Sequence, residues 1–150
     1  MTNKVKTLLL AIVVLAGCRN ANNKSIVEST KDSQITAAPI NCTIDPNNIE
    51  VKAMENFKGG EGTLMMKMFQ DGENRIMFCT MPAGSSVGYH THDSSFEVVL
   101  VEKGTATILF DSIEYTYSEG QAHYCPKGHS HSITNATDSD LVLYNVVGGQ

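Results

Sequence analysis

Short runs of apolar, β-branched and aromatic residues alternate with turn-forming residues between positions 49 and 150. Six runs have the composition and length of β-strands: 63–69, 75–81, 97–102, 105–110, 113–117 and 141–147. Glycines 72, 84, 104 and 120 separate them at intervals that suit tight turns and bends. No ten-residue stretch of this part has the 3.6-residue apolar period of a helix. The pattern therefore predicts one all-β domain, built as a sandwich or a barrel.

The first seventeen residues have a different pattern. Lys4 and Lys6 precede a ten-residue apolar run (8–17), which is too short to span a bilayer comfortably and is typical of a secretory signal. The run ends in the sequence Leu-Ala-Gly-Cys (15–18), which resembles the lipobox of bacterial lipoproteins. That resemblance implies that Cys18 is acylated and becomes the first mature residue. The alternative is an ordinary cleaved signal followed by a chance cysteine.

A polar segment separates this signal from the β-rich part. It is rich in Asn, Ser, Thr and Lys, and it cannot bury enough apolar surface to offset its ordering entropy. We therefore predict a signal peptide (1–17), a flexible tether that begins at lipidated Cys18 (18–48), and one folded domain (49–150). The expected location is an exported one, anchored by lipid to a bacterial membrane. Arg19 favours the outer membrane, where the cell has one, because the inner-membrane retention signal has Asp at that position.

Composition limits the partners and the redox chemistry. A chain of 150 residues with a net charge of −5 has room for one domain, and no cluster of Lys and Arg indicates nucleic-acid binding. With Cys18 lipidated, Cys42, Cys79 and Cys125 remain, and their connectivity cannot be deduced from sequence. Cys79 lies in an apolar run and is expected to be a small buried residue. A role for Cys125 as an additional soft metal ligand is the less favoured interpretation.

The segment Gly-Tyr-His-Thr-His-Asp-Ser-Ser-Phe-Glu (88–97) raises the question of a metal site. Side chains two apart on a strand point the same way, so His90 and His92 can converge on one ion. Glu97 has the opposite parity, but the turn-forming residues 93–95 allow the chain to reverse and return it on the neighbouring strand. His131, after a turn marked by a proline and a glycine, adds a third imidazole. Such a set suits Mn, Fe, Co, Ni or Zn. The alternative is that these are solvated polar residues of a loop.

Two segments, 84–104 and 120–135, resemble the two sequence motifs of the cupin superfamily. The first motif has a glycine, His-x-His, a glutamate and a second glycine, which are here Gly84, His90, His92, Glu97 and Gly104. The second has a glycine, Pro-x-Gly, a histidine and an asparagine, which are here Gly120, Pro126, Gly128, His131 and Asn135. No fixed position departs from either pattern. The segment 81–92 and the upstream Gly-Gly-Glu-Gly-Thr-Leu (59–64) are most similar to small cupins described as oxalate-binding or oxalate decarboxylase-like.

The resemblance implies a jelly-roll β-barrel with a metal inside it. It assigns His90, His92, Glu97 and His131 as ligands of one divalent transition metal (Mn, Fe, Ni or Zn), and a structural role to Asn135. Barrels of that superfamily often pair into dimers, so the resemblance makes a homodimer a possible assembly.

Two functions remain open at this point, because one fold hosts many chemistries. The first is a metal-dependent lyase or oxidoreductase acting on a small carboxylate or oxygenated metabolite. His129 is then the candidate catalytic acid–base residue; His123 is a second candidate that we expect at the surface. The second is a non-catalytic module that binds a small anion. A structural lipoprotein with a vestigial site is disfavoured, because all four ligands are present.

Overall fold

The computed structural model describes residues 43–149, which belong to one compact unit, Asn41–Gln150. The predicted signal peptide, Cys18, Cys42 and most of the predicted tether lie outside the described residues. The described part holds ten strands: β1 (Lys52–Glu55), β2 (Thr63–Asp71), β3 (Asn74–Met81), β4 (Ser86–Thr91), β5 (Ser95–Lys103), β6 (Thr105–Phe110), β7 (Ile113–Ser118), β8 (Ala122–Cys125), β9 (Ser130–Thr134) and β10 (Leu141–Gly149). Its two helical turns, η1 (Pro46–Asn48) and η2 (Phe57–Gly59), are of the 3-10 type. Within residues 43–149 no helix is long and apolar enough to cross a membrane.

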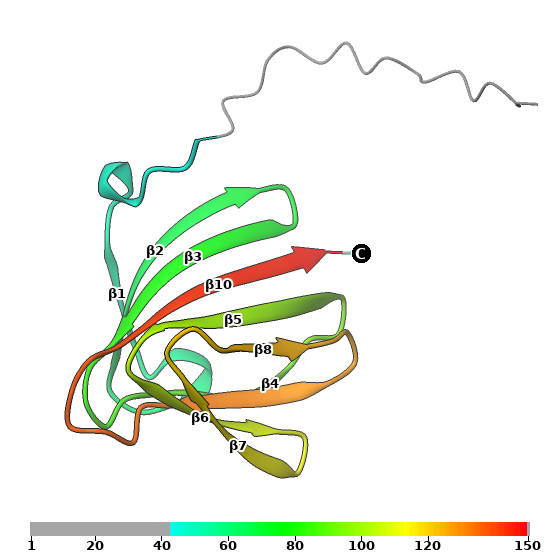
Figure 1. Cartoon of the computed structure of the whole chain (residues 1–150). Helices are drawn as coiled ribbons and strands as arrows, with labels where there is room; N and C mark the ends of the chain where they lie inside the picture. The colour runs from blue at the N-terminus through cyan, green and yellow to red at the C-terminus, as the bar shows by residue number, and fades with distance from the viewer. Residues whose placement is uncertain (1–42, 150) are drawn as a thin grey trace, which may run out of the picture. The chain divides into compact units, whose positions relative to one another are not determined.

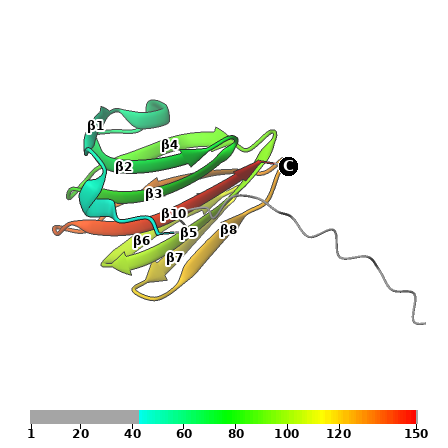
Figure 2. The same ribbon diagram turned by 90° about the horizontal axis from the view of Figure 1, so that it is seen from above.

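The strands form two antiparallel sheets. The larger has the order β1-β2-β3-β10-β5-β8, and the smaller has the order β4-β9-β6-β7. Figures 1 and 2 show β2, β3, β10 and β5 side by side in the larger sheet. Non-consecutive strands lie next to each other in both sheets, because the last strand inserts between β3 and β5 and β9 inserts between β4 and β6.

Alternation along the strands decides which side chains face the interior. Alternate residues are buried along the central parts of β3, β5, β9 and β10, and most of these residues are aliphatic or sulfur-containing. The core contains Leu64, Met66, Met77, Cys79, Met81, Val87, Val99, Val101, Ala106, Ile108, Ile133, Leu141, Leu143 and Val147. The same buried parity also places three polar residues inside: Glu97 on β5, His131 on β9 and Asn145 on β10. A polar site is therefore built into one part of an apolar interior.

The six strands predicted from the sequence are all present, and each is at least as long as predicted. His90 lies on β4 and His131 on β9, as expected, whereas His92 lies directly after the end of β4 and not on the strand. The short strands β1 and β8 were not predicted. All four punctuating glycines adopt a positive φ, between 58° at Gly72 and 94° at Gly104, where a side chain would be strained.

One expectation about topology was wrong. The chain does reverse at residues 93–95, but β5 does not pair with β4. It joins the other sheet, so Glu97 approaches His92 from the opposite sheet and not from the neighbouring strand of the same sheet. Parity within a segment cannot reveal this, because the chain changes sheets at the turn.

Candidate metal centre

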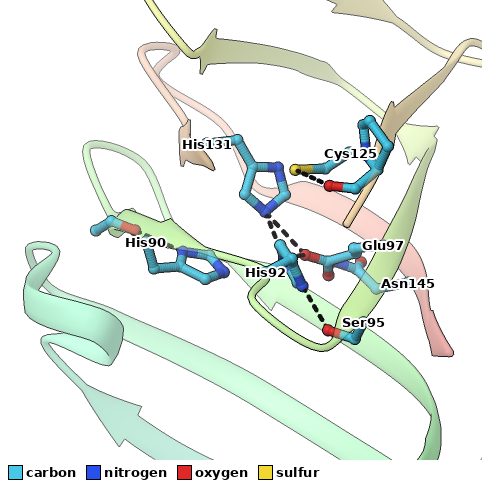
Figure 3. Close-up of polar contacts among 9 residues, drawn as sticks. His90, His92, Ser95, Glu97, Cys125, His131 and Asn145 are labelled. Carbon is cyan, nitrogen blue, oxygen red and sulfur yellow. Dashed lines mark hydrogen bonds and ion pairs between the residues drawn. The ribbon is translucent and has the colours of Figure 1, made fainter. Parts of the chain in front are cut away.

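Four side chains from three strands and one turn meet in the interior of the barrel. His90 lies on β4 directly opposite His131 on β9, and His92 follows the end of β4. Glu97 reaches them from β5 in the larger sheet. One potential ligand atom from each of the four residues lies within 4.8 Å of the others. Figure 3 shows the three imidazoles and the carboxylate pointing toward one another. The structure therefore brings together all four residues that the sequence predicted as ligands.

Three lone-pair atoms meet at the centre of this cluster. The distance from His92 Nε2 to Glu97 Oε2 is 3.1 Å, from His131 Nε2 to the same oxygen 2.9 Å, and between the two nitrogens 3.2 Å. All three side chains are buried. A neutral imidazole has one N–H and one lone pair, and a carboxylate oxygen only accepts. A cation can satisfy the three atoms at once, and the donor set is one that divalent transition metals prefer.

The remaining ring nitrogens hold two imidazoles in the form that binds a metal. His90 Nδ1 lies 2.9 Å from the Gly88 carbonyl oxygen, and His92 Nδ1 lies 3.0 Å from Ser95 Oγ. A carbonyl oxygen can only accept, so His90 must carry its proton on Nδ1 and keep a lone pair on Nε2. Ser95 Oγ can accept from His92 in the same way. Such partners fix the ring orientation of metal-binding histidines.

Glu97 is held as a carboxylate. Burial alone would raise its pKa, but the close approach of the His131 and His92 side chains and the hydrogen bond from Asn145 outweigh burial and hold the pKa well below its usual range. Asn145 Nδ2 donates to Glu97 Oε1 at 2.8 Å, which leaves Oε2 directed at the two imidazoles. Burial also lowers the pKa of His90, although its contact with Gly88 opposes the shift. Glu97 is therefore an ionised carboxylate and His90 is favoured as a neutral imidazole, which are the forms that bind a cation.

His123 is not the surface residue that we expected. It is only 3% exposed, and its Nδ1 lies 3.2 Å from the hydroxyl of Tyr117. Its ring lies 5.2 Å from that of His131, and His123 Nε2 and His131 Nδ1 are both buried and lack a hydrogen-bond partner in the described part of the chain. Burial, and then the proximity of His131, lower its pKa to about 4. His123 and the buried Cys125 are two residues apart on the short strand β8, so their side chains face the same side. This spacing was the signal that could have placed His123 in the interior.

Cys125 also lies near the cluster. Its Sγ and one ring nitrogen each of His123 and His131 lie within 4.8 Å of one another. Burial, followed by the charge of Glu97, raises the pKa of Cys125 to about 11, which disfavours the thiolate that a metal needs. Cys79 is buried, as expected, and both cysteines are free thiols.

His129, the candidate acid–base residue, points elsewhere. Its Nδ1 lies 2.8 Å from Asp111 Oδ2, and its ring stacks on Phe110 with the centroids 5.5 Å apart. The side chain is about half exposed. It does not line the pocket above the four-residue cluster. Its catalytic role remains a prediction, and its contacts indicate that it ties the turn after β6 to the turn before β9.

A pocket of about 230 Å³ lies over His90, His92 and Glu97. Its wall includes two cations, Lys58 and Arg75, that sequence reasoning did not identify. Neither cation forms an ion pair within residues 43–149, and the Lys58 ammonium lies 6.0 Å from the centroid of the Phe57 ring. No local signal could have found them, because η2 and β3 meet at the pocket only in the folded chain.

Two glycines allow η2 to approach the site. A Cβ on Gly88 in β4 would collide with the carbonyl oxygen of Lys58, and a Cβ on Gly60 would collide with the carbonyl oxygen of Ser86. The two backbones are further joined by a bond from the Ser86 N–H to the Glu61 carbonyl oxygen, at 2.8 Å. Backbone contact without side chains therefore sets the position of Lys58 next to the histidine-bearing strand.

Asn135 has the structural role that was expected of it. It is fully buried, and its Nδ2 donates to the carbonyl oxygens of Met81 and Ser139, at 2.9 and 2.8 Å. Its Oδ1 accepts from the hydroxyl of Thr137 at 2.7 Å. The amide thus joins the end of β3 to the loop before β10.

Comparison with known proteins agrees with this architecture. Residues 77–147 match the family model described as a cupin domain. An oxalate-binding protein of Thermotoga maritima is 29% identical over 107 residues, which cover 67% of this chain and 88% of that protein. Together with the double-sheet barrel, these matches support the cupin superfamily for this domain. The fold class predicted from the sequence, an all-β jelly-roll cupin barrel, is thereby confirmed.

Solved structures share the fold at low sequence identity. The crystal structure of a predicted oxalate decarboxylase from Thermotoga maritima has a TM-score of 0.68 and 24% identity, and covers 72% of this chain and 99% of its own. A sugar phosphate isomerase of the cupin superfamily from Silicibacter pomeroyi has a TM-score of 0.62 and 18% identity, with coverages of 72% and 76%. Neighbours with such different activities show the fold alone, so function must be argued from the site.

Proposed function

We propose that this protein binds one divalent transition metal (Mn, Fe, Ni or Zn) through His90, His92, Glu97 and His131, and binds a small carboxylate beside it. The observation that carries the proposal is the convergence of His92 Nε2, His131 Nε2 and Glu97 Oε2 within 3.2 Å of one another in a buried site. A bound ion would supply Lewis-acid polarisation and open coordination positions for the oxygens of a ligand.

The electrostatics of the pocket favour an anionic ligand. A divalent ion on three neutral imidazoles and one carboxylate keeps one net positive charge. Lys58 and Arg75 add two more on the pocket wall, and Asp93 and Glu97 are the acidic residues of that wall. The guanidinium of Arg75 can bind a carboxylate in a bidentate fashion. The similarity to an oxalate-binding protein supports the same ligand class.

Within this proposal each residue of the chain has a defined task. Gly88 and Ser95 hold the imidazoles of His90 and His92, and Asn145 holds the carboxylate of Glu97. Lys58 and Arg75 orient the ligand by its charge. Binding, rather than catalysis, is the function that the geometry supports best, because the candidate acid–base residue His129 does not line the pocket and is bonded to Asp111.

The experiment is a titration of metal-loaded protein with oxalate, in which each mixture is also assayed for product. The proposal predicts saturable binding that requires the metal, with no turnover. Product that forms only with the metal present would make the protein an enzyme, and loss of that product in His129→Ala would restore His129 to a catalytic role. Absence of any binding by metal-loaded protein would contradict the proposed ligand class.

We also propose that the domain is exported and anchored to a bacterial membrane through acylated Cys18. The proposal is supported by the charged, apolar and small-residue regions that precede this cysteine. Because the acyl chains would be its attachment, Cys18→Ser should release the protein from membranes or block its maturation. Unchanged partition of the variant into the membrane fraction would contradict the lipid anchor.

A further inference from the structure

We infer that the ligand is an amphiphilic carboxylate, whose charged end lies at the metal site and whose apolar chain lies in a neighbouring groove lined by methionines. The inference rests on the proposed function for the charged end of the ligand. The groove has a volume of about 570 Å³, and we call it the methionine groove; its walls include Phe57, Met54, Met66, Met68 and Met77.

The methionine groove continues the inner wall of the larger sheet. Met66 and Met68 have the same parity on β2 as buried Leu64, and therefore face the same side. Met68 pairs directly with Met77 on β3, and Met54 pairs with Leu64. The groove is thus an extension of the apolar interior beyond the closed part of the barrel. Methionine side chains are flexible and polarisable, which suits them to bind apolar chains of varied shape.

The methionine groove and the metal-site pocket share a wall. Phe57, Lys58, Arg75 and Met77 line both of them. A molecule whose carboxylate lies beside His90 and His92 would reach the groove along this shared wall, past the two cations. The metal-site pocket alone, at about 230 Å³, is smaller than an ordinary ligand pocket, whereas the groove falls within the usual range. The two together suit a longer molecule than oxalate.

Charge distinguishes the two ends of this combined site. The cations Lys58 and Arg75 stand at the junction, where a carboxylate arriving at the metal would be neutralised. The rest of the groove wall is mostly apolar, with four thioethers, the Phe57 ring and Ile49, and its other charged residues are Glu50 and Lys52, whose charges are opposite. An apolar chain attached to the carboxylate would bury itself against these side chains, and the hydrophobic effect would add to the affinity at the metal.

The test is a calorimetric titration of the metal-loaded full chain with oxalate and with butanoate, hexanoate and octanoate. We expect affinity along the monocarboxylate series to rise about fourfold for each buried methylene group. Met68→Ser should weaken octanoate binding about tenfold and leave oxalate binding unchanged. The matched control is Phe69→Ser: Phe69 is the next residue of β2, is 40% exposed against 39% for Met68, and faces the other side of the sheet. Phe69→Ser should change the affinity for neither octanoate nor oxalate.

The outcomes separate the two proposals. Oxalate binding with no gain along the series, or equal effects of the two substitutions, would overturn the inference and leave the proposed function standing. Octanoate binding that depends on Met68 in protein that ignores oxalate would support the groove and contradict the proposed small ligand. No carboxylate binding at all would overturn both. If Met68→Ser instead weakens self-association in sedimentation, without any effect on octanoate, the groove is a contact between copies and the inference fails.

Discussion

The side-chain amide of Asn145 on β10 donates to Glu97 on the neighbouring strand β5, with 2.8 Å between Nδ2 and Oε1. Both residues are almost fully buried. The bond leaves one carboxylate oxygen to meet the two imidazoles, and it lowers the pKa of Glu97 together with them. A single asparagine within an otherwise apolar strand therefore orients the only acidic residue of the predicted ligand set.

Asn145→Leu should weaken metal binding by a factor of about ten to a hundred, because partners of metal ligands typically have effects of this size. The substitution keeps the side-chain volume and removes the donor to Glu97. Affinity can be measured by competition with a chromogenic chelator. A folded variant with wild-type affinity would show that the amide does not hold the carboxylate for the ion.

His123→Phe should also weaken metal binding, by several-fold to tenfold, without abolishing it. To bind a metal through Nε2, His131 must carry its proton on Nδ1. In the described residues this buried atom has no hydrogen-bond partner, and neither has the nearby His123 Nε2. A small shift of the two rings would let His131 Nδ1 donate to His123 Nε2. His129→Phe is the control, because that imidazole is bound to Asp111 at the surface. Equal affinities in the two variants would contradict the role of His123.

Lys58→Gln and Arg75→Gln should each lower oxalate affinity about tenfold while metal content is retained, because each removes one cation from the pocket wall. Lys67→Gln is the matched control: Lys67 lies on β2 with the parity opposite to that of Met66 and Met68, and does not line this pocket. Calorimetry on proteins of equal metal content measures the effect. An equally large loss of oxalate affinity in Lys67→Gln would show that the effect comes from the net charge of the protein and not from the pocket wall.

The thiol of Cys79 should resist alkylation in the folded protein at pH 8. Burial, and then the charge of Glu97, raise its pKa to about 12, and only the thiolate reacts. An unfolded thiol ionises from a pKa of about 9, so the unfolded state loses this proton first as pH rises. The free energy of unfolding should therefore fall between about pH 9 and pH 12. Peptide mapping after iodoacetamide treatment, with and without denaturant, measures the reactivity; equal labelling in both would contradict it.

Much of the architecture could be predicted from the sequence, because alternation and turn residues are local signals. The six long strands and their turns rest on spacing within short segments, and the proposed ligand set rests on the resemblance to the two cupin motifs. The position of Glu97 on the opposite sheet could not be predicted, since parity does not tell to which sheet a strand belongs. Nor could Lys58, Arg75 or Asn145 be assigned, because they reach the site through packing between segments far apart in the sequence.

The most direct test of the central claim is the metal content of the protein purified from its native compartment, where it meets the ions that are available to it. Elemental analysis should find one divalent transition-metal ion per chain in the wild type. His92→Ala and His131→Ala, shown to be folded by circular dichroism, should each retain little metal, while Lys67→Gln should retain all of it. Wild-type protein without metal, or folded His131→Ala with the full metal content, would contradict the three-histidine, one-glutamate centre.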